Sequence, residues 1–177
     1  MKFAIVGATG NSGLCTSLQP HFEGCDAVFS CLGSPSLIKS TTIYSASMRA
    51  IITAMRGAKV KRILMMSSWY IKVDPDDDPG YMARWVVRSV LSKPLADLTV
   101  MEQFLEDEGQ DIDYTTVKPP MLIDGPSKGQ EIIVEIGREF CDTKNKKMSR
   151  ADVARFMLAN VKTEEHFKKS VSIGIKK

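Results

Sequence analysis

The sequence predicts an α/β protein with a doubly wound, mostly parallel sheet. Short apolar runs with the length of buried strands alternate with segments of helical periodicity, a pattern typical of a parallel sheet covered by helices on both faces. The first run leads directly into the glycine-rich stretch Gly7–Gly13, where such folds turn from a strand into a helix. At 177 residues, the chain is expected to form one domain spanning residues 1–177.

The strands are predicted from apolar runs that end at glycine, proline or polar turn residues. They span residues 3–6, 26–33, 61–67, 113–117, 131–136 and 171–175. The run at 131–136 alternates between apolar and polar residues, which is typical of an edge strand. Pro119 and Pro120 stop the strand before them.

The helices are predicted from apolar periodicity together with start and stop signals. They span residues 41–58, 82–91, 94–108 and 149–161, whereas Pro20 is expected to break the short helical start at 14–18. The signals are Ser40 or Thr41 as a cap, Gly57 near an end, Pro94 in a first turn, Gly109 after an end, and a capping box from Ser149 to Asp152.

The glycine-rich stretch has the spacing of a pyrophosphate-binding turn. Gly7 would allow the tight turn, Gly10 would let the backbone approach the phosphates, and Gly13 would permit close helix packing. A helix N-terminus also offers free N–H groups to an anion. The short polar side chains of Thr9, Asn11 and Ser12 stand at the same place. The alternative interpretation is a glycine turn without a ligand.

The composition is that of an ordinary globular protein, with 44% hydrophobic and 25% charged residues. The net charge of +3 is too small to predict a nucleic-acid partner, and no apolar run has the length needed to cross a membrane. The four cysteines form no CxxC pair and are expected to be free thiols in a reducing compartment. The expected location is therefore the cytoplasm.

Four segments carry a resemblance to a known family: GATGNSG at Gly7–Gly13, GCDAVFSCLG at Gly24–Gly33, MMSSWY at Met65–Tyr70 and VKPPMLIDGP at Val117–Pro126. The chain resembles the atypical short-chain dehydrogenases/reductases and, within them, the NAD(P)-binding NmrA-like group. It looks closest to the reductases of the biliverdin-IXβ and NADPH-dependent flavin reductase type. The resemblance implies a Rossmann-type fold and the cofactor NADP(H), with NAD also possible.

The resemblance also implies roles for individual residues. Ser68 takes the place of the active-site serine, and Trp69, Tyr70 and Met121 would line the acceptor pocket. The implied cofactor-binding positions are Gly7, Thr9, Gly10, Asn11, Ser12, Gly13, Leu32, Gly33, Ser67, Lys118, Pro119 and Pro120. The implied acceptor is FMN, FAD, riboflavin or biliverdin. Biliverdin-IXβ reductase has a histidine where Met121 stands, which weakens the case for a tetrapyrrole.

Two of these assignments have structural alternatives. Ser68 could be a strand-end serine that bonds its own backbone. Trp69 and Tyr70 could stack on a planar acceptor, or one could pack in the core while the other lies at the surface. The chemistry is also open, because a non-catalytic NAD(P) sensor of the NmrA type and an inactive shortened isoform are alternatives to a reductase.

The chain departs from the family between Gly13 and Gly24. The usual fold has two further strands with their helices there. One strand–helix–strand crossover needs about 30 residues, so residues 14–23 cannot hold both strands. The arginine that would select NADP is therefore missing as well. We expect residues 3–6 to become a sheet edge with an uncovered apolar face, prone to self-association. The origin of the gap, whether natural variation, splicing or a gene-model error, is left open by the sequence.

Other polar residues are not expected to carry chemistry. Tyr114 and Lys118 match the YxxxK pattern by letter, but they lie in a predicted strand, where this spacing does not form a dyad. His21 and His166 are expected at the surface. The aspartates at 74 and 76–78 are expected in a solvated loop, and no metal site is predicted.

Overall fold

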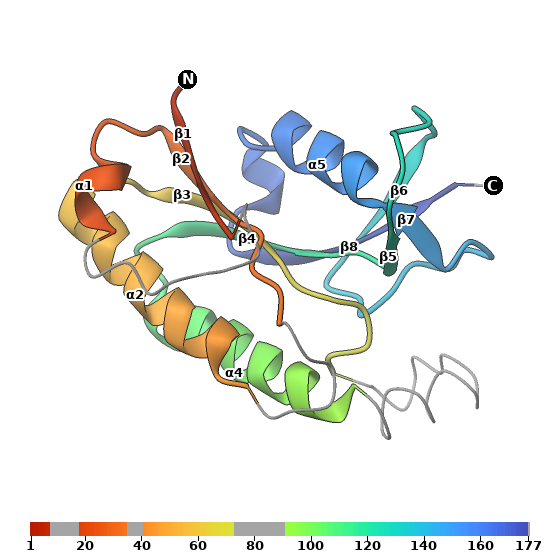
Figure 1. The fold of residues 1–177 in the computed structure, drawn as a ribbon, viewed down its shortest axis with the longest axis horizontal. Coiled ribbons are helices and arrows are strands. Elements are labelled where there is room, and N and C mark those ends of the chain that lie inside the picture. Colours follow the sequence, from red (N-terminus) through yellow and green to blue (C-terminus); the bar gives the residue numbers. More distant parts are fainter. Residues whose placement is uncertain (8–17, 35–40, 73–90, 177) are drawn as a thin grey trace.

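The computed structural model describes residues 1–7, 18–34, 41–72 and 91–176 of the chain (Figure 1). Six strands form the main sheet in the order β1-β2-β3-β4-β8-β6. The first five in this order run parallel, and β6 is antiparallel to β8. Their bounds are β1 Phe3–Val6, β2 Ala27–Ser30, β3 Arg62–Met66, β4 Asp113–Lys118, β8 Lys169–Ile175 and β6 Ile132–Ile136. The predicted α/β class with a mostly parallel sheet is confirmed.

Helices cover both faces of this sheet (Figure 1). Helices α2 (Ile43–Ala58) and α4 (Ser92–Glu108) pack on one face, and α5 (Arg150–Ala159) packs on the other. The short helix α1 (Gln19–Phe22) lies beside α2, and the 3₁₀ turn η1 (Glu164–His166) precedes β8. The structure is therefore layered helix–sheet–helix.

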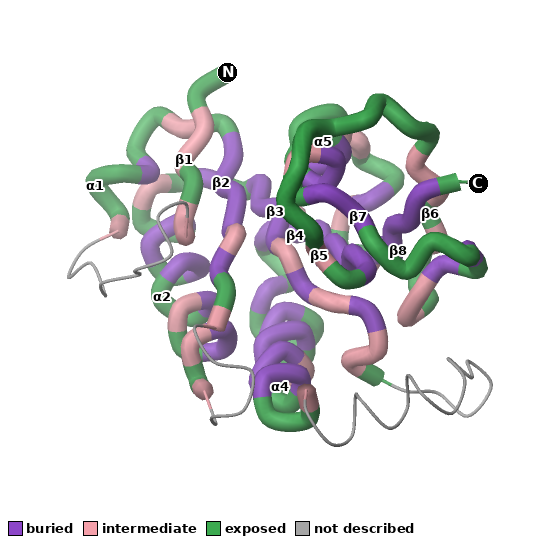
Figure 2. Tube along the Cα trace, turned by 45° about the vertical axis from the view of Figure 1, so that its right-hand side comes forward, coloured by how far each residue is buried: buried purple, intermediate pink, exposed green. Residues whose placement is uncertain are grey.

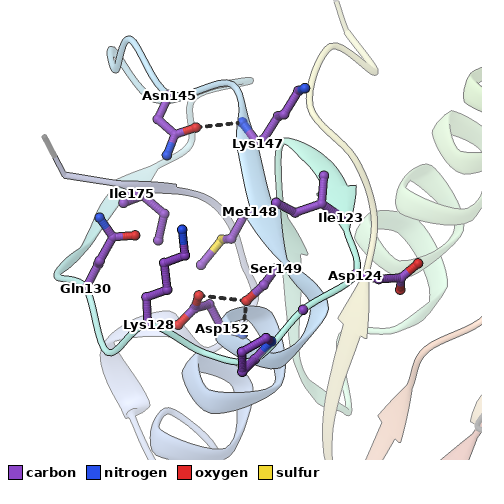
Figure 3. A pocket seen from close by; sticks show the side chains of 12 residues that line it. Ile123, Asp124, Lys128, Gln130, Asn145, Lys147, Met148, Ser149, Asp152 and Ile175 are labelled. Carbon is purple, nitrogen blue, oxygen red and sulfur yellow. Dashed lines mark hydrogen bonds between the residues drawn. The ribbon is translucent and has the colours of Figure 1, made fainter.

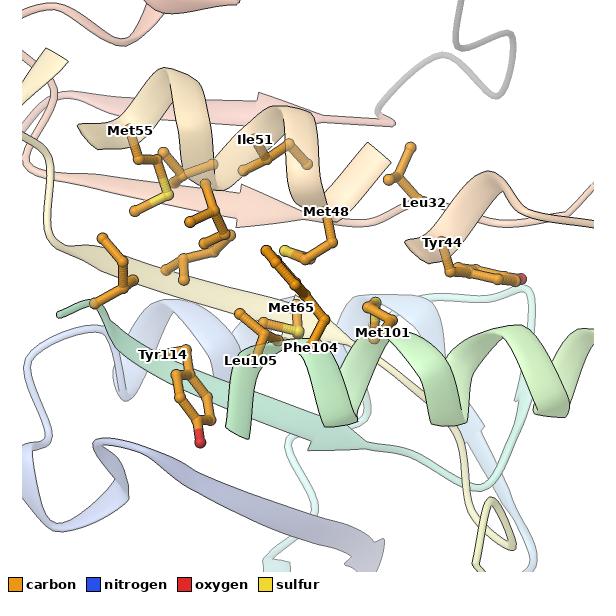
Figure 4. Close-up of a cluster of buried hydrophobic side chains, with 14 of the residues drawn as sticks. Leu32, Tyr44, Met48, Ile51, Met55, Met65, Met101, Phe104, Leu105 and Tyr114 are labelled. Atoms are coloured by element: carbon orange, nitrogen blue, oxygen red, sulfur yellow. The ribbon is translucent and has the colours of Figure 1, made fainter. Parts of the chain in front are cut away.

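Two apolar clusters form the core, one on each face of the sheet. Met48, Ile51 and Met55 of α2 meet Met101 and Leu105 of α4 above the strands (Figure 4). On the opposite face, α5 packs on β2, β3, β4 and β8. The central strands are consequently buried along nearly all their length, whereas β1 has three residues of intermediate burial and the exposed Ile5 (Figure 2). Parallel strands covered on both faces need such continuous apolar runs.

The expected edge position of the first strand is confirmed. Strand β1 is the end strand of the sheet, and β2 is its single neighbour among the described residues. Ile5 keeps 59% of its surface exposed on this strand. Between β1 and β2, the described part of the chain contains only helix α1. Self-association through this edge stays a prediction.

One short helix was not expected. Helix α1 begins at Gln19, and Pro20 lies in its first turn, where proline's missing N–H costs no helical hydrogen bond. The helical start expected before Pro20 lies, except for Leu18, outside the described residues. Gly57 stands near the end of α2, as expected, and Lys59, in a left-handed conformation, caps that helix. The side-chain amide of Gln19 in α1 lies over Gly57, where a Cβ would displace it.

A small second sheet was also missed. Strands β5 (Met121–Ile123) and β7 (Lys147–Ser149) pair in parallel. Three-residue strands carry too few positions to show a period of two, so their pairing depends on tertiary contacts. The helix predicted at 82–91 lies, except for Leu91, outside the described residues.

His166 was expected at the surface and is instead buried, with 7% of its surface exposed. Its ring stacks on Phe156 of α5 at a centroid distance of 6.2 Å. Its Nδ1 atom has no hydrogen-bond partner among the described residues. Charged neighbours in the sequence, such as Glu164 and Glu165, are typical of an exposed segment, but a single turn can point alternate side chains inward.

Candidate active site at the strand ends

The carboxyl ends of β1 and β2 converge closely at Gly7. The N–H of Cys31 donates to the carbonyl of Val6 over 2.8 Å, directly before the glycine. Gly7 has φ of +87°, and a Cβ there would lie 2.8 Å from the carbonyl oxygen of Cys31. Both the conformation and the space therefore require glycine. Beyond this point Leu32 is buried and Gly33 faces open space, which leaves backbone accessible to a ligand.

This arrangement fits a dinucleotide, because ligands of open parallel sheets bind beyond the carboxyl ends of the strands. Gly7, Leu32 and Gly33 all lie at that edge. The phosphate-binding positions Thr9, Gly10, Asn11, Ser12 and Gly13 lie outside the described residues. Their role stays a prediction.

The two serines at the end of β3 differ in their surroundings. Ser67 is buried: its N–H donates to the carbonyl of Val117 over 2.8 Å, and its hydroxyl donates to Oε1 of Glu102 over 2.8 Å. Ser68 is half-buried, and its hydroxyl has no hydrogen-bond partner in the part of the chain that the structure describes. The hydroxyl that the sequence assigned to catalysis is therefore available to a ligand, whereas that of Ser67 is not.

A buried ionic network lies under these serines. The ammonium of Lys118, at the end of β4, lies 3.2 Å from Oε2 of Glu102 and donates to Oε1 of Glu139 over 2.6 Å. The Lys118 and Glu102 side chains are 2% and 4% exposed. Burial raises the pKa of the Glu102 carboxyl, and Lys118 and the Ser67 hydroxyl oppose this rise. Since the Lys118 ammonium is enclosed by two carboxylates, it orders the site rather than facing open space.

Glu139 extends this network to the segment after the serines. Its Oε2 accepts from the N–H of Lys72 over 2.9 Å, and its backbone carbonyl accepts from the N–H of Tyr70 over 3.4 Å. Tyr70 has φ of +65°, an uncommon conformation for a non-glycine residue. The contacts from Glu139 hold the segment in this conformation.

The proline pair that follows β4 lies against the segment that contains the serines. Pro119 and Pro120 are buried, and the carbonyl of Pro119 accepts from the N–H of Trp69 over 3.1 Å. Met121, the first residue of β5, is 59% exposed. The structure thus brings Ser67, Ser68 and Trp69 beside the proline pair, so two of the four segments that carry the resemblance lie together.

An aromatic cluster made of Trp69, Tyr70 and Phe140 follows the serines. The ring centroids are 5.8 Å apart for Trp69 and Tyr70, 6.2 Å for Trp69 and Phe140, and 5.4 Å for Tyr70 and Phe140. Trp69 is 3% exposed, and its Nε1 has no hydrogen-bond partner within the described ranges. Tyr70 and Phe140 are half-buried. The ammonium of Lys146 lies 5.4 Å from the Trp69 ring and 5.5 Å from the Phe140 ring.

A second polar network orders the end of β2. Asp97 of α4 is buried and accepts from the N–H of Tyr44 over 2.9 Å and from the hydroxyl of Ser45. The Tyr44 hydroxyl in turn accepts from the N–H of Ser34 over 2.8 Å. Burial raises the pKa of this phenol. Helices α2 and α4 thereby fix the backbone that follows Gly33.

Sequence reasoning missed Asp97, Glu102, Glu139, Phe140 and Lys146. A signal existed for Glu102, because it lies on the apolar face of α4 between Leu98 and Leu105, and a charge on such a face needs a buried partner. Glu139, Phe140 and Lys146 belong to irregular segments, which carry no periodic pattern. Their place beside the serines is a result of tertiary folding.

A cavity of about 390 Å³ lies elsewhere, between the β5–β7 sheet, the loop at 124–130 and the start of α5 (Figure 3). Lys128, Gln130, Asn145 and Lys147 line it, together with the paired side chains of Ser149 and Asp152. None of the predicted site residues lines this cavity. It is therefore separate from the strand ends described above.

The described residues offer neither a metal site nor a membrane span. No group of three or more histidine, cysteine or acidic side chains among them could hold a metal ion. No helix in this part of the structure is both long and apolar enough to cross a membrane.

Comparison with known proteins gives the same fold. A family model described as NAD(P)H-binding matches residues 7–164. A Burkholderia pseudomallei protein provisionally assigned as exported has 19% identity and a TM-score of 0.74, with 98% of this chain and 87% of that chain covered. A Streptococcus pneumoniae protein provisionally assigned as an NADH-flavin reductase has 21% identity and a TM-score of 0.69, with the same coverage.

A short-chain dehydrogenase/reductase from Veillonella parvula, solved in complex with NADP, is also similar. It has 16% identity and a TM-score of 0.66, and the match covers 89% of this chain but 66% of that chain. These likenesses establish a Rossmann-like fold. The match therefore covers a smaller share of the Veillonella protein than of this chain.

Proposed function

Since this chain belongs to the NAD(P)H-binding family, we propose that it is an NADPH-dependent reductase that transfers a hydride to a planar acceptor of the flavin or biliverdin type. The bound dinucleotide would supply the hydride. The observation that carries the proposal is the unpartnered hydroxyl of Ser68, within the described chain, at the same sheet edge as the close backbone approach at Gly7.

The chain's own residues would bind and orient the reactants. Gly7, Leu32 and Gly33 offer backbone to the dinucleotide, and the Ser68 hydroxyl can donate to the nicotinamide amide or to the acceptor. The buried Glu102–Lys118 pair holds α4 and the end of β4 in place beneath them. No side chain is needed as a proton donor, because the reduced acceptor can take its proton from solvent.

The neighbour assigned as an NADH-flavin reductase shares this fold at 21% identity and supports a flavin acceptor. The neighbour solved with NADP shares the fold as well and supports the choice of cofactor. A non-catalytic sensor is the second candidate. The edge position of β1 bears on both candidates alike, because both must hold the dinucleotide and the strand whose end usually reads the ribose is missing beside β1 among the described residues.

Mixing the purified protein with NADPH and FMN and following the cofactor's absorbance tests the proposal. Turnover should be lost in Gly10→Val, where a side chain would block the phosphates, and reduced in Ser68→Ala. Thr53→Ala is the matched control, because it removes an exposed hydroxyl from α2. NADPH binding without oxidation would establish the sensor, and the absence of binding by folded protein would refute both.

A further inference from the structure

Lys146 is a cation that the described part of the structure leaves without a carboxylate. It is exposed and has no ion-pair partner among the described residues. Its ammonium instead lies within 6 Å of the centroids of two rings, Trp69 and Phe140, which is the range of a cation–π contact. This contact holds the charge at the border of the aromatic cluster, where a ligand stacked on the rings would meet it.

A backbone hydrogen bond connects Lys146 to the segment that follows the proline pair. The carbonyl of Lys146 accepts from the N–H of Met121 over 3.2 Å, and Met121 follows the proline pair that Trp69 contacts. Lys147, the next residue, begins β7 and lines the separate cavity (Figure 3). Neighbouring lysines therefore serve two different surfaces, and this gives a matched pair for experiment.

The Trp69 indole adds an independent sign of a ligand. Its Nε1 is a buried donor with no acceptor within hydrogen-bonding distance in the described chain, and leaving such a group unpaired is unfavourable. The half-buried rings of Tyr70 and Phe140 pack against the same indole. A planar molecule could stack on the half-buried rings of Tyr70 and Phe140, and its ring carbonyl could accept the indole hydrogen bond by displacing the atoms that now cover Nε1.

We propose that Trp69, Tyr70, Phe140 and Lys146 form the acceptor half of the site, and that Lys146 makes the protein select a planar acceptor with an anionic group, FMN over riboflavin. This inference rests on the proposed function. In the reaction, NADPH loses one hydride, and the flavin gains that hydride and one solvent proton, so NADP⁺ and the reduced flavin leave. Lys146 takes no part in this chemistry and acts on binding alone.

The first test compares KM for FMN and for riboflavin in wild type, Lys146→Gln and Lys147→Gln. Wild type should have the lower KM for FMN. Lys146→Gln should raise KM for FMN about two- to fivefold, the range of an exposed ion pair, while kcat and the KM for riboflavin stay the same. Lys147→Gln should match wild type. Equal KM values for the two flavins in wild type, or an equal effect of both lysine variants, would overturn the inference.

The second test uses Trp69→Phe and flavin binding measured by fluorescence in the absence of NADPH. Phenylalanine removes the unpaired donor and also part of a buried ring, so the variant should fold with a somewhat lower melting temperature. Weaker binding of both flavins by the folded variant supports the inference, and unchanged binding contradicts it. Because this readout needs no turnover, Lys146-dependent FMN binding without oxidation would overturn the proposed reductase and keep the acceptor surface.

Discussion

Replacing Lys118 with methionine tests the buried ionic network. The ammonium lies between Glu102 and Glu139, and the Lys118 and Glu102 side chains are at most 4% exposed. The methionine side chain would fill most of the volume but leave two carboxylates without a cation. Removing one partner of a buried pair costs about 3–5 kcal/mol, so unfolding in urea at neutral pH should show a loss of that size. For a domain of this length, the melting temperature should fall by about 6–20 °C.

The loss should depend on pH. Burial already raises the pKa of Glu102 above its ordinary value, and Lys118 opposes that rise. Without the lysine the native pKa rises further, so native Glu102 keeps a proton that the unfolded chain releases above about pH 4.5. Stability is then lost as pH rises from the unfolded value through the native one. The variant should be closer to wild type at about pH 5 than at about pH 8.

The double variant Lys118→Met with Glu102→Gln provides the control. Glutamine keeps an oxygen for the Ser67 hydroxyl and carries no charge, so most of the lost stability should return and the pH dependence should diminish. A loss under about 1 kcal/mol in Lys118→Met, or a double variant that loses the sum of the single effects, would refute a coupled buried network.

Three further predictions concern the fold. Gly7→Ala should lower the free energy of unfolding by about 1–3 kcal/mol, because a φ of +87° and the Cys31 carbonyl 2.8 Å away both oppose a Cβ. Gly33→Ala, whose Cβ meets no atom within 4 Å, should melt like wild type. Equal melting temperatures for the two variants would contradict the tight turn at Gly7. Burial lowers the pKa of His166 below its ordinary value of 6.5, so as pH falls the unfolded chain takes up a proton before the native state does, and stability should fall below about pH 6.5. Urea titrations at about pH 7.5 and 5.5 should show this loss of stability in wild type and not in His166→Gln. Ile5→Lys should reduce self-association through β1 at little cost in stability, because Ile5 is 59% exposed; light scattering that finds wild type monomeric at all concentrations would remove this prediction.

The order of strands and helices followed from local patterns in the sequence. The runs at 26–33, 61–67 and 113–117 contain the strands β2, β3 and most of β4, because buried parallel strands need continuous apolar stretches. Helix α4 was predicted almost to its ends from Pro94 and from one apolar face. The edge position of β1 followed from the family resemblance, since the short connection between Gly13 and Gly24 cannot build the strands that the family's sheet has beside β1.

Only part of the candidate site could be predicted from the sequence. Gly7, Ser68 and the proline pair lie at strand ends, and the fold class fixes where strand ends meet. The sequence could not assign the Ser67 hydroxyl to Glu102, nor show that two carboxylates enclose Lys118. Those partners come from α4 and from the segment before Cys141, far along the chain, and no local rule relates them.

The sequence by itself predicted the layered α/β fold and, through the fold class, the sheet edge at which ligands of such folds bind, because the strand and helix signals depend on residue types within a short window. Only the tertiary structure decided which of the side chains around the candidate site have polar partners and which have none. It left the Ser68 hydroxyl, the Trp69 indole and the Lys146 ammonium without polar partners in the described chain, while it enclosed Lys118 and His166. The physical reason is that burial and pairing depend on contacts between segments distant in sequence.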